Sequence, residues 1–137
     1  MYKKLFLIFC VFGFIGISFA ADKPLDKKVY AYYFHGFMRC STCHKLEQYS
    51  KEAIESNFKS EIASGKLEFR AINVDEKVNA HFISEYQLYT KALILSLIKD
   101  GKEMKSKNLN KIWEFAGNKD KFIEYIKQEV TNFLQEL

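Results

Sequence analysis

The chain has 137 residues, which is enough for one domain of ordinary size and too few for two. Hydrophobic residues make up 48% of the sequence, so the chain can bury a packed core. The formal net charge is only +4 and the lysines are interspersed with glutamates, which argues against a nucleic-acid-binding protein.

Residues 1–20 have the pattern of a secretory signal sequence. Lys3 and Lys4 precede an almost wholly apolar run, and small residues precede a cleavage point after Ala20. We therefore expect export, into a bacterial periplasm or otherwise out of the cytoplasm. The alternative is a retained membrane anchor, although the apolar run of about 15 residues is shorter than the ~20 that a span needs.

Cleavage after Ala20 would remove Cys10 and leave residues 21–27 as a polar lead-in to a domain over residues 28–137. Cys40 and Cys43 would then be the two cysteines of the mature protein. An even pair in an exported protein is compatible with a lasting disulfide.

The two cysteines form a C-x-x-C motif at a predicted junction between a strand and a helix. The apolar run 29–34 precedes them and a helical pattern follows, for which Ser41 or Thr42 is a suitable N-cap. This arrangement brings two sulfurs within bonding distance at a helix N-terminus, where thiolates are favoured.

The remaining elements follow from hydrophobic periodicity and turn residues. Residues 29–34 and 92–98 are continuous apolar runs, typical of strands buried on both faces. Asp100-Gly101 favours a tight hairpin. In chain order we predict a strand at 29–34, a helix ending near 64, a strand at 67–74, a helix at 77–86, a strand at 92–98, an edge strand at 103–107, a loop at 108–118 and a helix at 120–137.

This order, β-α-β-α-β-β-α, predicts an α/β domain with a mixed four-stranded sheet and helices on both faces. The first two strands are joined through a helix and are expected to be parallel, whereas the hairpin adds an antiparallel pair. Cys40 and Cys43 lie beyond the C-terminal end of the first strand, where open α/β sheets place their chemistry.

At this point the chain resembles the thioredoxin-like superfamily. The resemblance rests on the order and spacing of Tyr33-Phe34, Cys40-Ser-Thr-Cys43, Asn73-Val-Asp-Glu76 and Lys99-Asp-Gly-Lys102 over nearly all of residues 28–137. It implies a three-layer thioredoxin-like fold and a thiol–disulfide oxidoreductase acting on protein thiols or disulfides. It also implies a membrane thiol reductase or oxidase as a further partner.

The resemblance makes Cys40 the nucleophile and Cys43 the resolving thiol. Local electrostatics agree, because Arg39 and the helix N-terminus both favour a thiolate at Cys40. His35, His44 and Lys91 are further candidate modulators, of which His35 is a candidate proton shuttle.

The sequence departs from the thioredoxin pattern in three places. The Trp-Cys-Gly-Pro-Cys of thioredoxins is here Arg39-Cys-Ser-Thr-Cys43, and Tyr33 falls near the family's buried acid. The cis-proline that faces the disulfide is expected at 90–93, where no proline occurs, so Lys91 or Ala92 takes its place in a trans conformation. Its loss puts substrate recognition in question and opens space beside the sulfurs for a metal or cluster.

Two other functional classes remain open at this stage. Cys40-Ser-Thr-Cys43-His44 also fits c-type haem attachment with His44 as axial ligand, although the predicted strands argue against a small cytochrome. Cys40, Cys43, His44 and His35 could also hold a metal, although zinc sites usually use two separated ligand pairs. The third alternative is a non-catalytic module with a permanently closed disulfide. We expect no haem, no metal and no cofactor other than the redox-active disulfide.

Overall fold

The computed structural model describes residues 27–137. The predicted signal sequence, Cys10 and residues 21–26 of the lead-in lie outside the described residues. The elements are β1 (Lys27–His35), α1 (Ser41–Asn57), α2 (Lys59–Ala63), β2 (Leu67–Asn73), the 3-10 helix η1 (Lys77–Asn79), α3 (His81–Glu85), β3 (Ala92–Lys99), β4 (Lys102–Asn108), the 3-10 helix η2 (Asn110–Ile112) and α4 (Lys119–Leu134).

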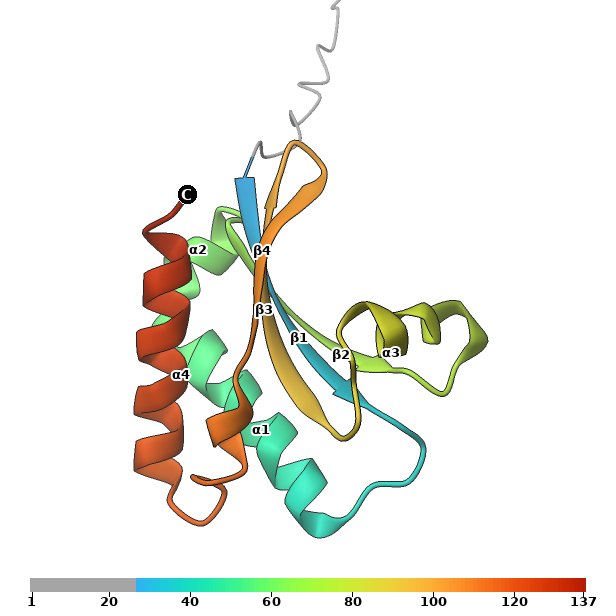
Figure 1. Cartoon of the computed structure of the whole chain (residues 1–137). Helices are drawn as coiled ribbons and strands as arrows, with labels where there is room; N and C mark the ends of the chain where they lie inside the picture. Colours follow the sequence, from blue (N-terminus) through green and yellow to red (C-terminus); the bar gives the residue numbers. More distant parts are fainter. Residues whose placement is uncertain (1–26) are drawn as a thin grey trace, which may run out of the picture.

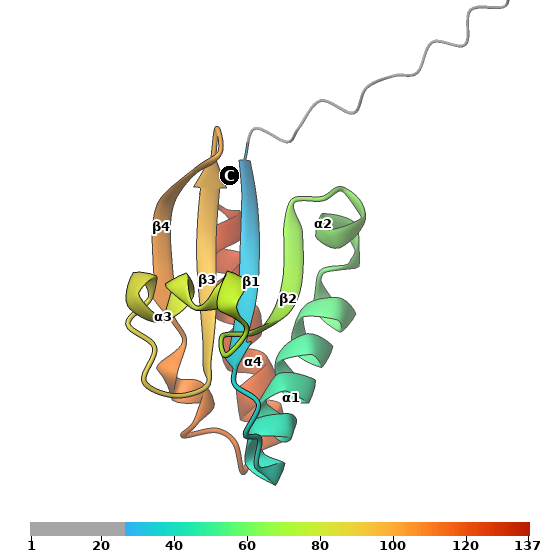
Figure 2. The ribbon, with the colours of Figure 1, turned by 90° about the vertical axis from the view of Figure 1, so that its right-hand side faces the viewer.

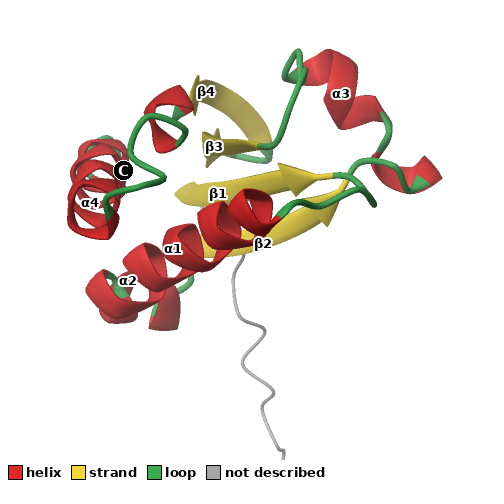
Figure 3. Cartoon of the chain, turned by 90° about the horizontal axis from the view of Figure 1, so that it is seen from below, coloured by secondary structure: helices red, strands yellow, loops and turns green. Residues whose placement is uncertain are grey.

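The four strands form one mixed sheet in the order β2-β1-β3-β4 (Figure 1). β1 pairs with β2 in parallel and with β3 in antiparallel orientation, and β3 and β4 form an antiparallel hairpin. Helices α1, α2 and α4 lie on one face and α3 lies on the other (Figure 3). The predicted α/β class, the mixed sheet and the helices on both faces are therefore confirmed.

The main core lies between the sheet and helices α1 and α4. Alternate residues of β1 point into it, which is why Val29, Ala31 and Tyr33 are fully buried. The stripe predicted for the closing helix supplies its other side, with Phe122, Ile126, Val130 and Phe133 all buried.

The second face of the sheet is covered at one end only. Figure 2 shows α3 crossing this face, and beneath it Phe34, Ala92 and Ile94 form a smaller core with Phe82 and Tyr86. Towards the other end, the Tyr30 and Tyr32 rings stack 5.1 Å apart and Arg70 lies 4.8 Å from the Tyr30 ring centre. The prediction that the first strand is buried on both faces is therefore wrong at Tyr30 and Tyr32, which are only half-buried.

The helix predicted at 77–86 is broken into η1 and α3. The Asn79 amide donates a hydrogen bond to the Asn73 carbonyl at 2.9 Å and ties η1 to the end of β2, which competes with a continuous helix. Val78, in η1, is therefore exposed.

The hairpin and the edge strand are as predicted. Asp100 and Gly101 both have positive φ, at 51° and 76°, as a tight two-residue hairpin requires. β4 is exposed along its whole length and carries lysines that discourage pairing with another chain. None of the helices found between residues 27 and 137 has the length and apolar character to cross a bilayer.

Candidate redox site

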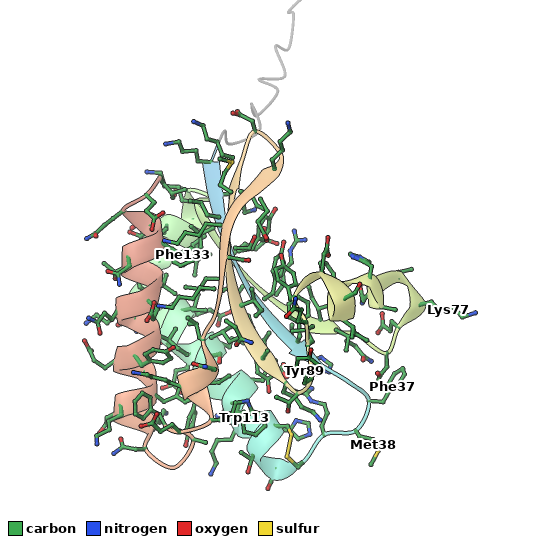
Figure 4. All side chains as sticks on the ribbon, in the orientation of Figure 1. Phe37, Met38, Lys77, Tyr89, Trp113 and Phe133 are labelled. Carbon is green, nitrogen blue, oxygen red and sulfur yellow. A yellow bond between two sulfur atoms is a disulfide. The ribbon has the colours of Figure 1, made fainter. Side chains whose placement is uncertain are left out.

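Cys40 and Cys43 form a disulfide at the start of α1, beyond the C-terminal end of β1 (Figure 4). Their Cα atoms are 5.1 Å apart, within the ordinary range for a disulfide. Cys40 is exposed, whereas Cys43 is 3% exposed. An incoming thiol therefore reaches Cys40 more easily than Cys43.

Cys40 is itself the N-cap of α1. Its Sγ accepts a hydrogen bond from the backbone N–H of Cys43 at 3.2 Å, and its carbonyl accepts one from His44 N at 3.1 Å. The expectation that Ser41 or Thr42 caps the helix is therefore wrong, because both lie within it. The first turn carries no acidic residue, so no carboxylate there opposes a negative charge on the Cys40 sulfur.

Tyr33 lies beneath the disulfide, and its hydroxyl donates a hydrogen bond to the Cys43 carbonyl at 2.7 Å. The side chain is fully buried, and this burial raises the pKa of Tyr33 to about 12, with the positive charge of Arg39 acting in the opposite direction. The hydroxyl therefore remains a donor over the whole neutral range. The sequence resemblance puts Tyr33 near the family's buried acid and gives no signal for this hydrogen bond, although the alternation along β1 places the Tyr33 side chain on the helix-covered face.

Arg39, predicted to favour the Cys40 thiolate, forms an ion pair with Glu47 of α1. Both side chains are mostly shielded from solvent, at 19% and 25% exposure. Part of the Arg39 charge is therefore balanced by Glu47 and not directed at the sulfur alone.

The two candidate histidines lie in different surroundings. The His35 Nδ1 donates a hydrogen bond to the Gly36 carbonyl at 3.0 Å, and its ring centre is 6.3 Å from that of Tyr33. His44 is exposed on the first turn of α1.

The structure gives no support to the metal and haem alternatives. Over residues 27–137, no three His, Cys, Asp or Glu side chains are grouped as metal ligands, so His35 and His44 do not complete a site with the cysteines. The two cysteines are held as a disulfide, which is the arrangement that thiol–disulfide exchange uses.

The loop over residues 36–39 is anchored by Asp75. Its carboxylate accepts a hydrogen bond from the backbone N–H of Phe37 at 2.7 Å. A Cβ added to Gly36 would lie 2.5 Å from Asp75 Oδ2, so a side chain at residue 36 would displace this carboxylate.

The loop over residues 87–91 faces the 36–39 loop. A cavity of about 200 Å³ separates it from the 36–39 loop, with Phe34, Val74, Ile83 and Leu88 as apolar walls and Lys91 at one side. The Lys91 carbonyl accepts a hydrogen bond from the Trp113 indole N–H at 3.1 Å. Every peptide bond within residues 27–137 is trans, as expected where the proline is missing.

Comparison with known proteins adds little to this geometry. No protein-family model matches the chain, and no curated protein matches its sequence. Among solved structures, a thioredoxin from Fasciola hepatica matches over 74% of this chain and 80% of its own, with 22% identity and a TM-score of 0.41. The sheet order, the strand directions and the disulfide at the start of α1 are the ones that the sequence resemblance implies. The fold is thioredoxin-like.

Exposed apolar side chains lie at the same end of this thioredoxin-like domain as the disulfide. Phe37, Met38 and Tyr89 are 70%, 84% and 94% exposed, and Trp113 is 37% exposed. They come from three separate loops of the chain (Figure 4).

Proposed function

We propose that this protein is an exported thiol–disulfide oxidoreductase that exchanges disulfides with protein thiols through Cys40 and Cys43. One observation carries the proposal: an exposed sulfur and a buried sulfur are joined in a disulfide whose exposed member caps a helix. A helix N-terminus stabilises a thiolate, and the thiolate is the nucleophile in disulfide exchange.

The first step of substrate reduction takes place at the exposed sulfur. In the dithiol form, the Cys40 thiolate attacks one sulfur of a substrate disulfide. A bond forms between Cys40 Sγ and that sulfur, the substrate S–S bond breaks, and the second substrate sulfur leaves as a thiolate and takes a proton from solvent. The Cys43 N–H, which points at Cys40 Sγ, supports the negative charge before attack.

The second step resolves the mixed disulfide. Cys43 loses its proton and attacks Cys40 Sγ, which re-forms the Cys40–Cys43 disulfide and releases the first substrate sulfur as a thiol. Two electrons have then passed from the protein to the substrate. Substrate oxidation follows the same steps in reverse.

The surroundings of the disulfide favour protein substrates. Phe37, Met38, Tyr89 and Trp113 offer exposed apolar contact area at the same end of the domain as the sulfurs, as is typical of surfaces that bind other proteins. Each cycle leaves the pair in the wrong redox state for the next, so a second partner is needed to restore it. A membrane thiol reductase or oxidase fits this role in an exported protein, and the pattern of residues 1–20 favours such a location.

Cysteine variants test the proposal. Cys40→Ser is expected to abolish reduction of insulin disulfides, and Cys43→Ala is expected to accumulate mixed disulfides through Cys40 because the second step is blocked. Non-reducing electrophoresis detects the trapped species. Turnover that persists in Cys40→Ser would reject the proposal. A disulfide that resists mild reductants, with nothing trapped by Cys43→Ala, would favour the non-catalytic module instead.

The reduction potential of the pair decides the direction of electron flow. A value near that of thioredoxin, about −270 mV, indicates a reductant, whereas one near about −120 mV indicates an oxidant. Equilibration with glutathione redox buffers, followed by thiol counting, gives this value.

A further inference from the structure

Few interactions among its own residues stabilise the conformation of the 87–91 loop. Gln87 has a φ of 51°, a left-handed conformation that residues with a side chain rarely adopt. Tyr89 is almost fully exposed, and Thr90 is exposed as well. No proline restricts the backbone between Gln87 and Ala92.

Space on both sides of the loop removes much of the packing that would otherwise fix it. The cavity of about 200 Å³ lies on one side, and a smaller cavity of about 100 Å³ lies between the loop and η2. Residues 88–91 line both cavities. Side chains that border these open hollows have few protein atoms to pack against on that side, so this loop is weakly packed.

The loop is fixed at both ends and at one point between them. Leu88 N donates to the Ile83 carbonyl at 2.9 Å, and Ala92 pairs with Phe34 in the sheet. Among the hydrogen bonds of residues 27–137, the one from Trp113 Nε1 to the Lys91 carbonyl is the single bond that joins residues 89–91 to another element.

Trp113 is well placed to act as a rigid anchor. It follows η2, in which Ile112 is fully buried, and its own N–H donates to the Asn110 carbonyl at 3.3 Å. Leu109, also fully buried, donates from its N–H to the Leu93 carbonyl at 2.8 Å. The segment that carries the indole is therefore fastened both to the core and to β3, the strand that the loop enters.

We propose that Trp113 is a positioning residue for disulfide exchange, because its indole N–H holds the Lys91 carbonyl and so fixes the 87–91 loop across the cavity from the 36–39 loop, which leads directly into Cys40. A substrate chain that reaches Cys40 would then contact both loops. The proposal rests on the proposed function. Trp113 lies 22 residues further along the chain than Lys91, and its indole fixes a loop that contains no proline. Trp113 acts through the loop and does not touch the sulfurs in any step of the exchange.

The test is Trp113→Phe, which keeps an aromatic ring and removes the N–H donor. Loss of one neutral hydrogen bond to a loop that receives substrate is expected to raise KM for insulin roughly three- to tenfold with kcat unchanged. The rate with glutathione disulfide, which is too small to depend on the loop, is expected to stay the same. Backbone order parameters of Tyr89, Thr90 and Lys91 are expected to fall from rigid values of about 0.85 towards 0.6.

Tyr125→Phe is the matched control. Tyr125 packs against Phe115 on the same segment, with ring centres 5.6 Å apart, but it does not line either cavity beside the loop. This variant also removes one polar group from an aromatic side chain. It is expected to leave both KM and the order parameters of the loop unchanged.

The possible results separate the two proposals. Unchanged KM and order parameters in Trp113→Phe overturn the role of Trp113 while leaving the redox function intact. An equal loss of rate with insulin and glutathione disulfide also overturns it, because the indole would then act on the sulfurs or on the whole fold. If the unmodified protein reduces neither disulfide, the redox function fails and the positioning role fails with it. A change in order parameters then shows only that the indole holds the loop.

Discussion

The two loops on either side of the cavity are held by different means. The 36–39 loop is packed against the Asp75 carboxylate so closely that a Cβ on Gly36 would displace it. The 87–91 loop has cavities on both sides, and the indole hydrogen bond is the one bond that joins its residues 89–91 to another element. The comparison shows that one loop of a site can be fixed by close packing and the other by few hydrogen bonds.

The largest expected effect is at the packed loop. Gly36→Ala places a Cβ 2.5 Å from Asp75 Oδ2, so the carboxylate must move away and lose its bond to Phe37 N. We expect a loss of about 2 kcal/mol in the free energy of unfolding, measured by urea denaturation. Gly117→Ala is the control, because its Cβ would meet nothing within 4 Å. Equal effects of the two substitutions would contradict this account.

Removal of the carboxylate should cost less. Asp75→Ala loses the hydrogen bond to Phe37 N at an exposed position, and we expect about 1 kcal/mol. In this background Gly36→Ala no longer meets a carboxylate, so its own cost should fall below about 0.5 kcal/mol. The thermodynamic cycle is measured with the same urea denaturation. If the free-energy costs of Gly36→Ala and Asp75→Ala simply add, a group other than the Asp75 carboxylate causes the crowding at Gly36.

The Tyr33 hydroxyl supports the first turn of α1, which contains Cys43. Tyr33→Phe leaves the Cys43 carbonyl without this donor and should cost about 1 kcal/mol. Because burial raises the Tyr33 pKa from 10.0 to about 12, its contribution to stability is complete below pH 10 and is lost as the pH rises through about 12.

This pH dependence can be measured directly. Tyrosinate absorbance should show one late-titrating group fewer in Tyr33→Phe, and stability should fall less steeply between pH 10 and 12. Tyr89→Phe serves as the control, since no hydrogen bond of the described residues uses the Tyr89 hydroxyl. An unchanged alkaline titration in Tyr33→Phe would contradict the assignment.

The smallest expected effect tests whether the two loops are independent. Asp75 and Trp113 share no hydrogen-bond partner within residues 27–137. The costs of Asp75→Ala and Trp113→Phe should therefore add to within about 0.5 kcal/mol in the double variant. A larger coupling energy would mean that the two loops move together and are not held independently.

Much of the fold follows from local signals in the sequence. The apolar runs at 29–34 and 92–98, the Asp100-Gly101 turn and the stripe of α4 each specify their element, and the order of elements then specifies the sheet. The position of the cysteines at the start of α1 follows in the same way. These features depend on residues that are close together in the chain.

The sequence did not predict the contacts between residues that are far apart in the chain. The hydrogen bond between Trp113 and Lys91 joins residues 22 apart, and the anchoring of Phe37 by Asp75 joins residues 38 apart. Neither contact leaves a periodic signal. The capping residue was missed by one or two positions, because the point at which the chain enters a helix depends on where the preceding loop is held.

The hydrogen bond from Cys43 N to Cys40 Sγ has a consequence for the energetics of the whole domain. Under the proposed function, the same N–H would face a Cys40 thiolate in the dithiol form, and a charge-assisted bond is the stronger one. The stability of the fold and the uptake of electrons would then be thermodynamically linked. A substitution that weakens the beginning of α1 would also disfavour the reduced form, so the first turn of this helix would tune the reduction potential.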